Sequence, residues 1–246
     1  MQGIKNKKVL ITAGATGIGK ATAIALLNAG AQVHVCDIDA EALAQLKQLH
    51  PLLLTSVTNV AEPDEVAKMF VQLQQEFLGQ LDFLVNNAGV SGPAGPLESL
   101  DIDAWKATFD VNLHATFYVS KHAIPLLKRQ GGAIMNLSST AGLYGYPMRS
   151  PYASAKWAIV GLSKTMAMEL GPFNVRVNCI CPGPINTGMT AEIKDEHKAI
   201  YARRRTALRL YGQPEEVAHM ILSLVLPASS FTTGAILTVD GGLSIR

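Results

Sequence analysis

Short apolar runs alternate with longer segments of helical periodicity along nearly the whole chain. The runs are rich in β-branched residues and occur at 9–12, 32–37, 52–57, 83–86, 133–137, 175–180 and 235–239. Helical patterns lie between them, at 17–28, 40–49, 63–77, 103–129, 151–170 and 214–226. Several expected strands are almost wholly apolar, which is typical of strands covered by helices on both faces. The alternation predicts an α/β fold: a doubly wound parallel sheet of about seven strands flanked by helices.

No linker, repeat or low-complexity segment interrupts this series, so residues 1–246 are expected to form a single domain. The weakest patterning is at about 184–210, a stretch rich in polar residues with prolines near its start. Long segments of this kind inside a compact domain are usually functional. We therefore expect a mobile segment that covers a substrate site.

Composition and charge exclude several classes of protein. The chain has 48% hydrophobic residues, and its 21 basic and 19 acidic residues give a net charge of +2. A nucleic-acid binder needs a concentrated basic surface, and the only tight basic cluster is Arg203-Arg204-Arg205. That cluster is interpreted as a solvated helix end, with contact to an anionic substrate or a neighbouring subunit as the alternative.

The cysteines predict neither a disulfide framework nor a metal site. There are three, and no Cys/His group has the spacing of a zinc site. Cys179 and Cys181 lie two apart in an apolar run, so both are expected to be buried on one side of a strand. The N-terminus does not resemble a signal peptide, and no apolar run is long enough to span a membrane. We expect a soluble cytoplasmic protein with no metal, nucleic-acid or membrane partner.

The segment from Thr12 to Gly19 joins the first expected strand to the first helix and is rich in small residues. Small residues let a phosphate approach the amide groups at a helix N-terminus. Asp37 ends the second strand, about 20 residues on, where a carboxylate can bind both adenosine ribose hydroxyl groups and repel a 2′-phosphate. The pattern favours NAD over NADP. The alternative is that Asp37 caps the next helix, a role that Asp39 could also fill.

Tyr152 and Lys156 are four residues apart in an expected helix, so they share one face with Cβ atoms about 5–6 Å apart. A nearby ammonium group favours the phenolate and is expected to lower the tyrosine pKa from about 10. Ser138 and Ser139 lie just upstream and could supply a hydroxyl group. Asn86-Asn87-Ala88-Gly89 closes the fourth strand, where asparagines contact ribose or satisfy buried backbone groups.

These motifs occur in a characteristic order: the turn at 12–19, Asn59-Val60, Asn86-Asn87-Ala88-Gly89, Asn112, Ser139, Tyr152-x-x-x-Lys156, Pro182-Gly183 and Asp240-Gly241-Gly242. In order and spacing, the chain resembles the classical short-chain dehydrogenases/reductases over nearly its whole length. The resemblance implies a single NAD(P)-binding Rossmann-fold domain. It also implies a homotetramer in which the helices around Asn112 and Tyr152 pack against partners, with Trp105 and Trp157 in that contact.

The resemblance also implies roles for individual residues. Asn112, Ser139, Tyr152 and Lys156 match the catalytic positions, and Asn112 is expected to kink its helix and hold a water that relays protons. Asn59 and Val60 match adenine contacts, while Ile185 and Thr187 match positions near the carboxamide and pyrophosphate. The expected cofactor-binding set is Gly14, Thr16, Gly17, Ile18, Gly19, Asp37, Ile38, Asn59, Val60, Asn86, Ala88, Gly89, Tyr152, Lys156, Pro182, Gly183, Ile185 and Thr187.

We therefore expect an NAD-dependent oxidoreductase that interconverts a secondary alcohol and a ketone, with Tyr152 as acid and base. Two alternatives stay open: a 3-oxoacyl-(carrier protein or CoA) reductase, and a catalytically silent protein that senses NAD(H). One position departs from the family pattern, because Ala13 stands where glycine is usual. A methyl group there is expected to require a negative φ.

The substrate pocket is expected to be mainly apolar and aromatic, which fits a ring-bearing or medium-chain secondary alcohol or ketone. The alternative for Tyr144 and Tyr146 is packing at a subunit contact. The candidate lining residues are Ser91, Leu143, Tyr144, Tyr146, Met148, Met189 and Ile193.

Overall fold

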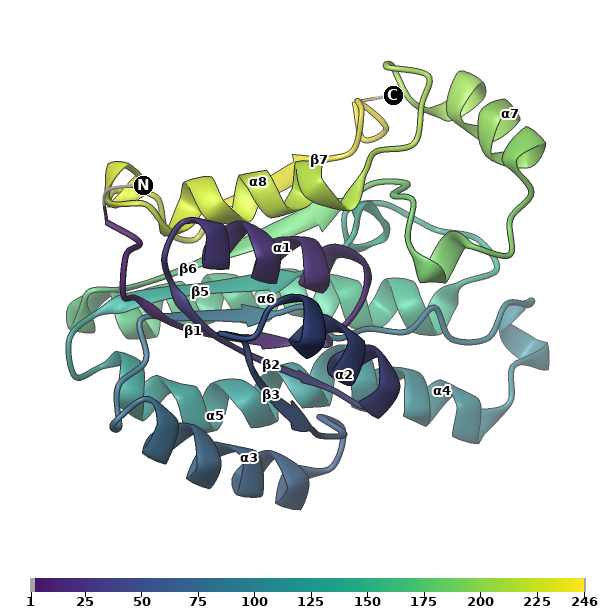
Figure 1. The fold of residues 1–246 in the computed structure, drawn as a ribbon. Helices are drawn as coiled ribbons and strands as arrows, with labels where there is room; N and C mark the ends of the chain where they lie inside the picture. Colours follow the sequence, from purple (N-terminus) through teal and green to yellow (C-terminus); the bar gives the residue numbers. More distant parts are fainter. Residues whose placement is uncertain (1–2, 246) are drawn as a thin grey trace.

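A seven-stranded parallel sheet forms the centre of the computed structural model, which describes residues 3–245 (Figure 1). Its strand order is β3-β2-β1-β4-β5-β6-β7, and every neighbouring pair is parallel. The strands are β1 (Lys8–Thr12), β2 (Gln32–Asp37), β3 (Leu54–Val57), β4 (Phe83–Asn86), β5 (Gly132–Leu137), β6 (Val175–Pro182) and β7 (Ile236–Val239). This arrangement confirms the predicted fold class. The strand order changes direction between β1 and β4: β1 to β3 follow one another toward one edge of the sheet, and β4 to β7 toward the other. In such folds, ligands bind at this switch point.

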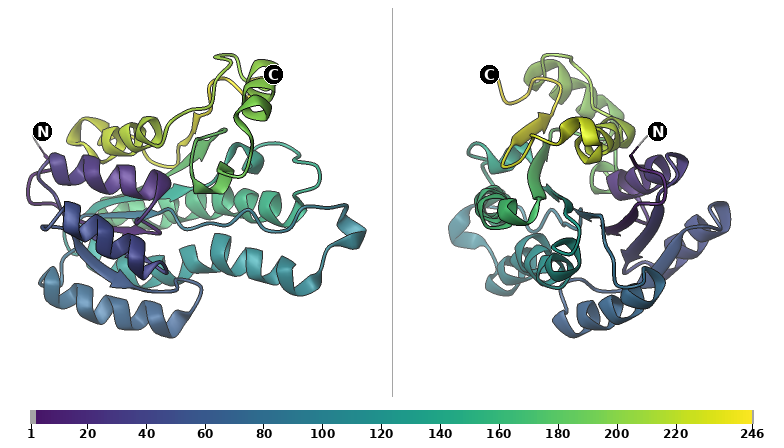
Figure 2. Two further views of the ribbon diagram at one scale, coloured as in Figure 1. Left: turned by 45° about the vertical axis from the view of Figure 1, so that its right-hand side comes forward. Right: turned by 90° about the vertical axis from the view of Figure 1, so that its left-hand side faces the viewer.

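Helices cover both faces of the sheet, as the two views in Figure 2 show. Helices α1 (Gly17–Asn28), α2 (Ala40–Leu49) and α8 (Pro214–Val225) contribute to one apolar core. Helices α3 (Pro63–Glu76), α5 (Ala115–Leu127) and α6 (Ser150–Leu170) contribute to the other. Alternate strand residues divide between the cores: Val9 and Ile11 face the first, and Leu10 faces the second. This two-sided burial explains the almost wholly apolar strands.

The region expected to be one long helix at 103–129 consists of three pieces. Helix α4 (Ile102–Phe109) leads into a π-helical turn at Asp110–His114, and α5 follows. A π-turn inserts one residue into the helical ladder and is common at functional sites. Smaller differences lie at the ends of elements: a turn at 51–52 delays β3, and β6 continues to Pro182.

The segment at 184–210 contains a 3-10 turn at Gly188–Thr190 and helix α7 (Asp195–Arg205). Figure 1 shows α7 beyond the C-terminal edge of the sheet, apart from the two helical layers. The last turn of α7 is formed by three exposed residues, Arg203, Arg204 and Arg205. Cations at the C-terminal end of a helix interact favourably with the helix dipole. The mobility of the segment stays a prediction.

No helix within residues 3–245 is long and apolar enough to cross a membrane.

Candidate active site

The turn after β1 adopts a backbone conformation that the sequence did not indicate. Ala13 has φ +49°, in the left-handed region, so the expected negative φ is wrong. The hydrogen bonds of the turn explain this, because the Ala13 carbonyl accepts from Asn87 Nδ2 at 2.8 Å and the Gly14 amide donates to the Cys36 carbonyl at 3.2 Å. Gly14 is needed for a different reason: a Cβ there would lie 2.6 Å from Val35 Cγ1. The turn is therefore held against β2 and β4 at the cost of a strained alanine.

Asn87 and Thr12 clamp this turn to the end of β4. The Thr12 hydroxyl accepts from the Asn87 and Ala88 amides at 3.0 and 3.1 Å, and Asn87 Nδ2 donates to the Thr12 carbonyl at 3.0 Å. Ala88 thus supports the turn after β1 through its backbone amide. Asn87 lines the cavity, and it is an addition to the expected cofactor-binding set.

Asn86 lies in the protein interior and does not face the cleft, which corrects its assignment as a cofactor contact. Its side chain is buried, and Nδ2 donates to Ser120 Oγ at 3.0 Å and to Asn136 Oδ1 at 2.8 Å. Asn136 in turn donates to Ser163 Oγ at 2.9 Å. This buried network ties β4 and β5 to α5 and α6, so Asn86 has a structural role, although its partners are side chains and not the backbone groups that were expected.

The Asp37 carboxylate stands at the C-terminal end of β2, beside the glycine turn. It accepts from the Ala15 amide at 3.0 Å and from the Asp39 amide at 3.2 Å. Asp39 caps α2 through the Ala42 amide at 2.9 Å, so Asp37 is not the cap. Ile38 beside it is 70% exposed. A partly exposed carboxylate and a bare apolar side chain therefore mark this edge of the sheet.

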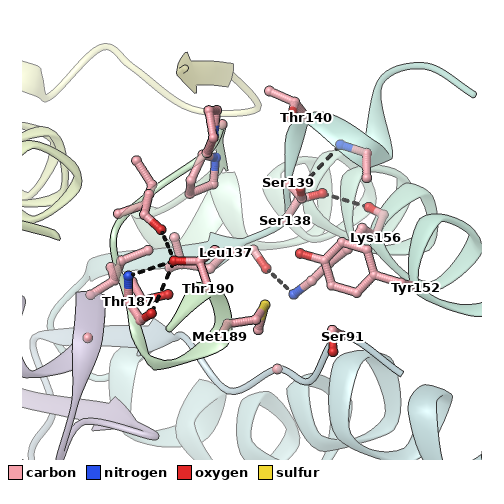
Figure 3. A pocket seen from close by; sticks show the side chains of 18 of the residues that line it. Ser91, Leu137, Ser138, Ser139, Thr140, Tyr152, Lys156, Thr187, Met189 and Thr190 are labelled. Carbon is pink, nitrogen blue, oxygen red and sulfur yellow. Dashed lines mark hydrogen bonds between the residues drawn. The ribbon is translucent and has the colours of Figure 1, made fainter. Parts of the chain in front are cut away.

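Three polar side chains meet between the C-terminal end of β5 and the first turns of α6 (Figure 3). Lys156 Nζ donates to the Leu137 carbonyl at 2.9 Å and lies 5.8 Å from the centre of the Tyr152 ring. Ser139 Oγ accepts from the Ala141 amide at 3.1 Å. Ser138 also borders the cavity, but its hydroxyl donates to the Lys156 carbonyl at 2.7 Å. The structure thus brings Ser139, Tyr152 and Lys156 to one wall and leaves Ser138 as a support for α6.

Asn112 lies in the π-turn, where it is fully buried and outside the cavity lining. Its Nδ2 donates to the Val90 and Thr108 carbonyls at 2.9 Å each, and its Oδ1 accepts from the Val90 amide at 3.3 Å. A Cβ added at Gly89 would lie 2.9 Å from Asn112 Oδ1 and 3.2 Å from Lys156 Nζ. The amide oxygen and the ammonium therefore converge on the bare backbone of Gly89. The predicted distortion of the helix at Asn112 is present.

Burial dominates the electrostatics of this wall. It lowers the pKa of Lys156 from 10.5 to about 8. It raises the pKa of Tyr152 above 10, while the Ser139 hydroxyl and then the charge of Arg149 act in the opposite direction. The expectation that Lys156 lowers the phenol pKa below 10 is therefore wrong. The ammonium is bonded to a carbonyl and lies over the ring, and loss of solvent around the phenol outweighs nearby positive charge.

A cavity of about 850 Å³ opens at this wall and extends to the glycine turn. Figure 3 shows Thr187, Met189 and Thr190 on the side opposite Ser139, Tyr152 and Lys156. Of the expected cofactor residues, those lining the cavity are Thr16, Gly17, Ile18, Gly89, Tyr152, Lys156, Pro182, Gly183, Ile185 and Thr187. The rest of that set lies outside this lining: Gly14, Gly19, Asp37, Ile38, Asn59, Val60, Asn86 and Ala88.

Five of the seven expected substrate-pocket residues line the cavity: Ser91, Tyr144, Tyr146, Met189 and Ile193. Leu143 is a correction, because it packs against the buried cluster that contains Cys179 and Cys181. Met148 is a second correction, because it has φ +66° and its half-exposed side chain does not line the cavity.

Sequence reasoning also missed one arginine and three ring-bearing residues of the same cavity: Arg149, His197, Tyr201 and Tyr211. Tyr201 and Tyr211 pack edge to face with ring centres 6.1 Å apart, and they join Tyr144 and Tyr146 in a tyrosine-rich wall. No motif marks these residues in the sequence. Arg149 alone had a usable signal, because it lies one helical turn before Tyr152.

The comparisons with known proteins agree with this geometry. The family model described as Enoyl-(Acyl carrier protein) reductase matches residues 12–244. A 3-oxoacyl-[acyl-carrier-protein] reductase of Thermotoga maritima is 38% identical over 98% of this chain and 99% of its own length. The chain belongs to the classical short-chain dehydrogenase/reductase family. A cyclohexanol dehydrogenase of Acinetobacter is also 38% identical, over 98% of this chain and 96% of its own.

Solved structures of short-chain dehydrogenases/reductases show the same fold. A short-chain type dehydrogenase/reductase from Mycobacterium ulcerans superposes with a TM-score of 0.93 at 33% identity, over 98% of this chain and 91% of that one. Family members act on CH–OH groups with NAD or NADP. The chain is therefore an oxidoreductase of this class in fold and in motif.

The residues present fit a bound dinucleotide of the kind this family uses. Thr16, the N-cap of α1, makes no side-chain capping bond, and the first turn of α1 has no acidic residue. The amide groups there are thus suited to a pyrophosphate. Asp37 and exposed Ile38 stand where the adenosine end would lie, and Lys156 and Thr187 line the cavity toward the other end.

Proposed function

We propose that the protein is an NAD-dependent oxidoreductase that interconverts a secondary alcohol and a ketone. The observation that carries the proposal is the convergence of Ser139, Tyr152 and Lys156 on one wall of an 850 Å³ cavity whose other end is the glycine turn. A protein that only sensed NAD(H) would have no need for a buried ammonium beside a phenol at the ligand cavity.

Each side chain of the wall has a defined task. Tyr152 accepts the hydroxyl proton of the alcohol in oxidation and returns it in reduction. Ser139 donates to the reacting oxygen and fixes its position. Lys156, held by the Leu137 carbonyl, supplies positive charge next to the phenol. Asn112, fixed by the Val90 and Thr108 carbonyls, is proposed to hold the water that relays protons between Lys156 and solvent. The cofactor, when bound, accepts or supplies the hydride.

The raised pKa of Tyr152 makes a cationic partner of the phenolate important. Burial disfavours the phenolate, so the charge of Lys156 has to act at short range in a site closed to water. The Lys156 pKa of about 8 leaves most of the ammonium charged at neutral pH. Lys156 is therefore suited to stabilise the phenolate when the site closes around a substrate.

NAD is proposed over NADP because of Asp37. Its negatively charged carboxylate accepts hydrogen bonds from two backbone amides, which hold it at the end of β2. A 2′-phosphate at this edge would meet that charge. Asp37→Ala should lower the ratio of kcat/KM for NAD to that for NADP by about 10–100-fold, and an unchanged ratio would remove Asp37 as the determinant.

The substrate is proposed to be a ring-bearing secondary alcohol. Four tyrosines besides Tyr152, together with Met189, line the cavity and offer flat and apolar surface. The cyclohexanol dehydrogenase of Acinetobacter carries a name that matches such a substrate. The second candidate is a 3-oxoacyl reductase, which is favoured by the Thermotoga relative of equal identity.

We also propose that the protein is a homo-oligomer, a tetramer by family resemblance. Phe117 on α5 and Trp157 on α6 are about half exposed, at 51% and 49%, on the helices expected at the contact. Light scattering that gives a monomer would reject this.

NADH absorbance is the test of the proposed function. The protein is mixed with NAD or NADP and a series of alicyclic secondary alcohols, and separately with NADH or NADPH and acetoacetyl-CoA. Turnover of cyclohexanol-type alcohols with NAD supports the proposal. Turnover of acetoacetyl-CoA alone supports the reductase, and NADH binding without any turnover supports the sensor.

A further inference from the structure

Arg149 places a cation in the substrate end of the cavity without a protein anion to neutralise it. It is half-buried, it lines the cavity, and it precedes Tyr152 by three residues as the N-cap of α6. None of the ion pairs among residues 3–245 involves Arg149. Burying a cation is unfavourable unless something compensates it, so its presence here calls for a partner.

The backbone satisfies Arg149 only in part. Its Nη1 donates to the Gly92 carbonyl at 3.1 Å and, at the limit of a hydrogen bond, to the Ser91 carbonyl at 3.5 Å. A guanidinium group has five N–H donors, and the bonds the structure contains all come from Nη1. The group is therefore fixed in place from one side, while its remaining donors are available to a ligand.

Within residues 3–245, acidic side chains are absent from the cavity lining and from the first turn of α6. Arg149, as the N-cap of α6, makes no side-chain capping bond. The N-terminal end of this 21-residue helix carries partial positive charge, so it adds to the positive potential of the guanidinium group. Asp240, whose charge is felt by the Tyr144 phenol, is occupied by the Gly242 and Ser244 amides.

We propose that Arg149 binds a carboxylate of the substrate, so that the physiological alcohol or ketone is an anion. The inference rests on the proposed oxidoreductase function and names its substrate class: a secondary alcohol that carries a carboxylate group beyond the reacting carbon. The planar fork of arginine matches a carboxylate with two parallel hydrogen bonds. Tyr146 and Met189 then hold the apolar body between that carboxylate and Tyr152.

A matched pair of alcohols tests this. The probes are trans-4-hydroxycyclohexanecarboxylate and its neutral counterpart trans-4-methylcyclohexanol, each oxidised with NAD. The wild-type protein should have the higher kcat/KM for the carboxylate. Arg149→Met should lower the ratio of the two kcat/KM values by about 10–100-fold, mainly through KM for the carboxylate, because a charge-assisted pair is lost. Arg149→Lys, which keeps the charge without the fork, should fall between.

Arg129→Met is the matched control. Arg129 also donates from Nη1 to a glycine carbonyl, that of Gly79 at 2.6 Å, but it is exposed and lies outside the cavity lining. The control should keep the wild-type ratio. Retained NADH binding by Arg149→Met shows that the variant has folded.

Isothermal titration with both probes separates the inference from the proposed function. If the wild type oxidises neither alcohol, the proposed function fails for this class, and the titration alone decides the inference. Tighter binding of the carboxylate by wild type than by Arg149→Met supports the role of Arg149. Equal binding of the two probes by the wild type, or an unchanged ratio in Arg149→Met, would overturn it.

Discussion

Lys156 should make the folded protein less stable at neutral pH than it would be with an apolar side chain there. The lysine pKa falls from 10.5 to about 8 on folding. The difference is 10.5 − 8, about 2.5 pH units, and at ~1.4 kcal/mol per unit it amounts to an unfavourable term of about 3 kcal/mol. The Lys156→Met variant removes this term but leaves the Leu137 carbonyl without its donor, which costs about 1–3 kcal/mol.

The pH dependence isolates the charge from the lost hydrogen bond. Below pH 8 both folded and unfolded lysine are protonated, so the full unfavourable term is present. Between about pH 8 and 10.5 the unfolded chain binds the proton and the folded protein does not, so wild-type stability rises with pH. The advantage of Lys156→Met should therefore be constant below pH 8 and shrink by about 3 kcal/mol by pH 10.5.

Urea unfolding of both proteins at pH 7, 8, 9 and 10 provides the measurement. Subtracting the wild-type free energy of unfolding from that of the variant cancels the cysteines and tyrosines that titrate in the same range. A difference that narrows above pH 8 supports a buried ammonium with a depressed pKa. A difference independent of pH would refute the reasoning, because Lys156 would then titrate alike in both states.

The remaining predictions concern the turn after β1, Gly89 and the Tyr152 phenol. Ala13→Gly should raise the free energy of unfolding by about 0.5–1 kcal/mol by urea titration, because the left-handed alanine costs more than glycine entropy. Gly14→Ala, whose methyl would meet a β2 side chain at 2.6 Å, should lower it by about 1–3 kcal/mol. If both variants moved stability the same way, the account of the turn would be wrong. Gly89→Ala should lower kcat about tenfold in steady-state assays, since its methyl displaces the Lys156 ammonium 3.2 Å away; an unchanged kcat contradicts this. Alcohol oxidation should accelerate from about pH 7 to 10, because burial keeps Tyr152 protonated and the reaction needs its phenolate; a flat kcat/KM profile argues against Tyr152 as base.

Sequence patterning could predict the fold because the sheet is buried on both faces. Central strands such as β1 and β4 are almost wholly apolar, so their positions are visible without knowledge of their neighbours. The break at Asn112 was visible only through the family resemblance, because nothing in the local pattern of 103–129 marks a π-turn. The Tyr152/Lys156 pair was visible from its four-residue spacing, whereas Asn112 and the choice of Ser139 over Ser138 came from the resemblance. The structure brings Ser139, Tyr152 and Lys156 together.

The errors come from properties that depend on long-range contacts. The φ of Ala13 is set by hydrogen bonds from Asn87 and to Cys36, which are remote in the sequence. The pKa of Tyr152 depends on burial by several elements, which a four-residue spacing cannot show. Leu143 lies in a loop whose direction no pattern fixes. The NAD preference, the tetramer, the cytoplasmic location and the mobility of 184–210 stay predictions.

Turnover by Tyr152→Phe tests the central claim most directly. The variant removes one hydroxyl group from the cavity wall, and Tyr118→Phe on α5, outside the cavity lining, is the control. Both are assayed for alcohol oxidation with NAD, and NADH binding is measured by titration. We predict that Tyr152→Phe loses about 10²–10⁴-fold in kcat while it still binds NADH, and that Tyr118→Phe stays active. Turnover by Tyr152→Phe at the wild-type rate would contradict the account.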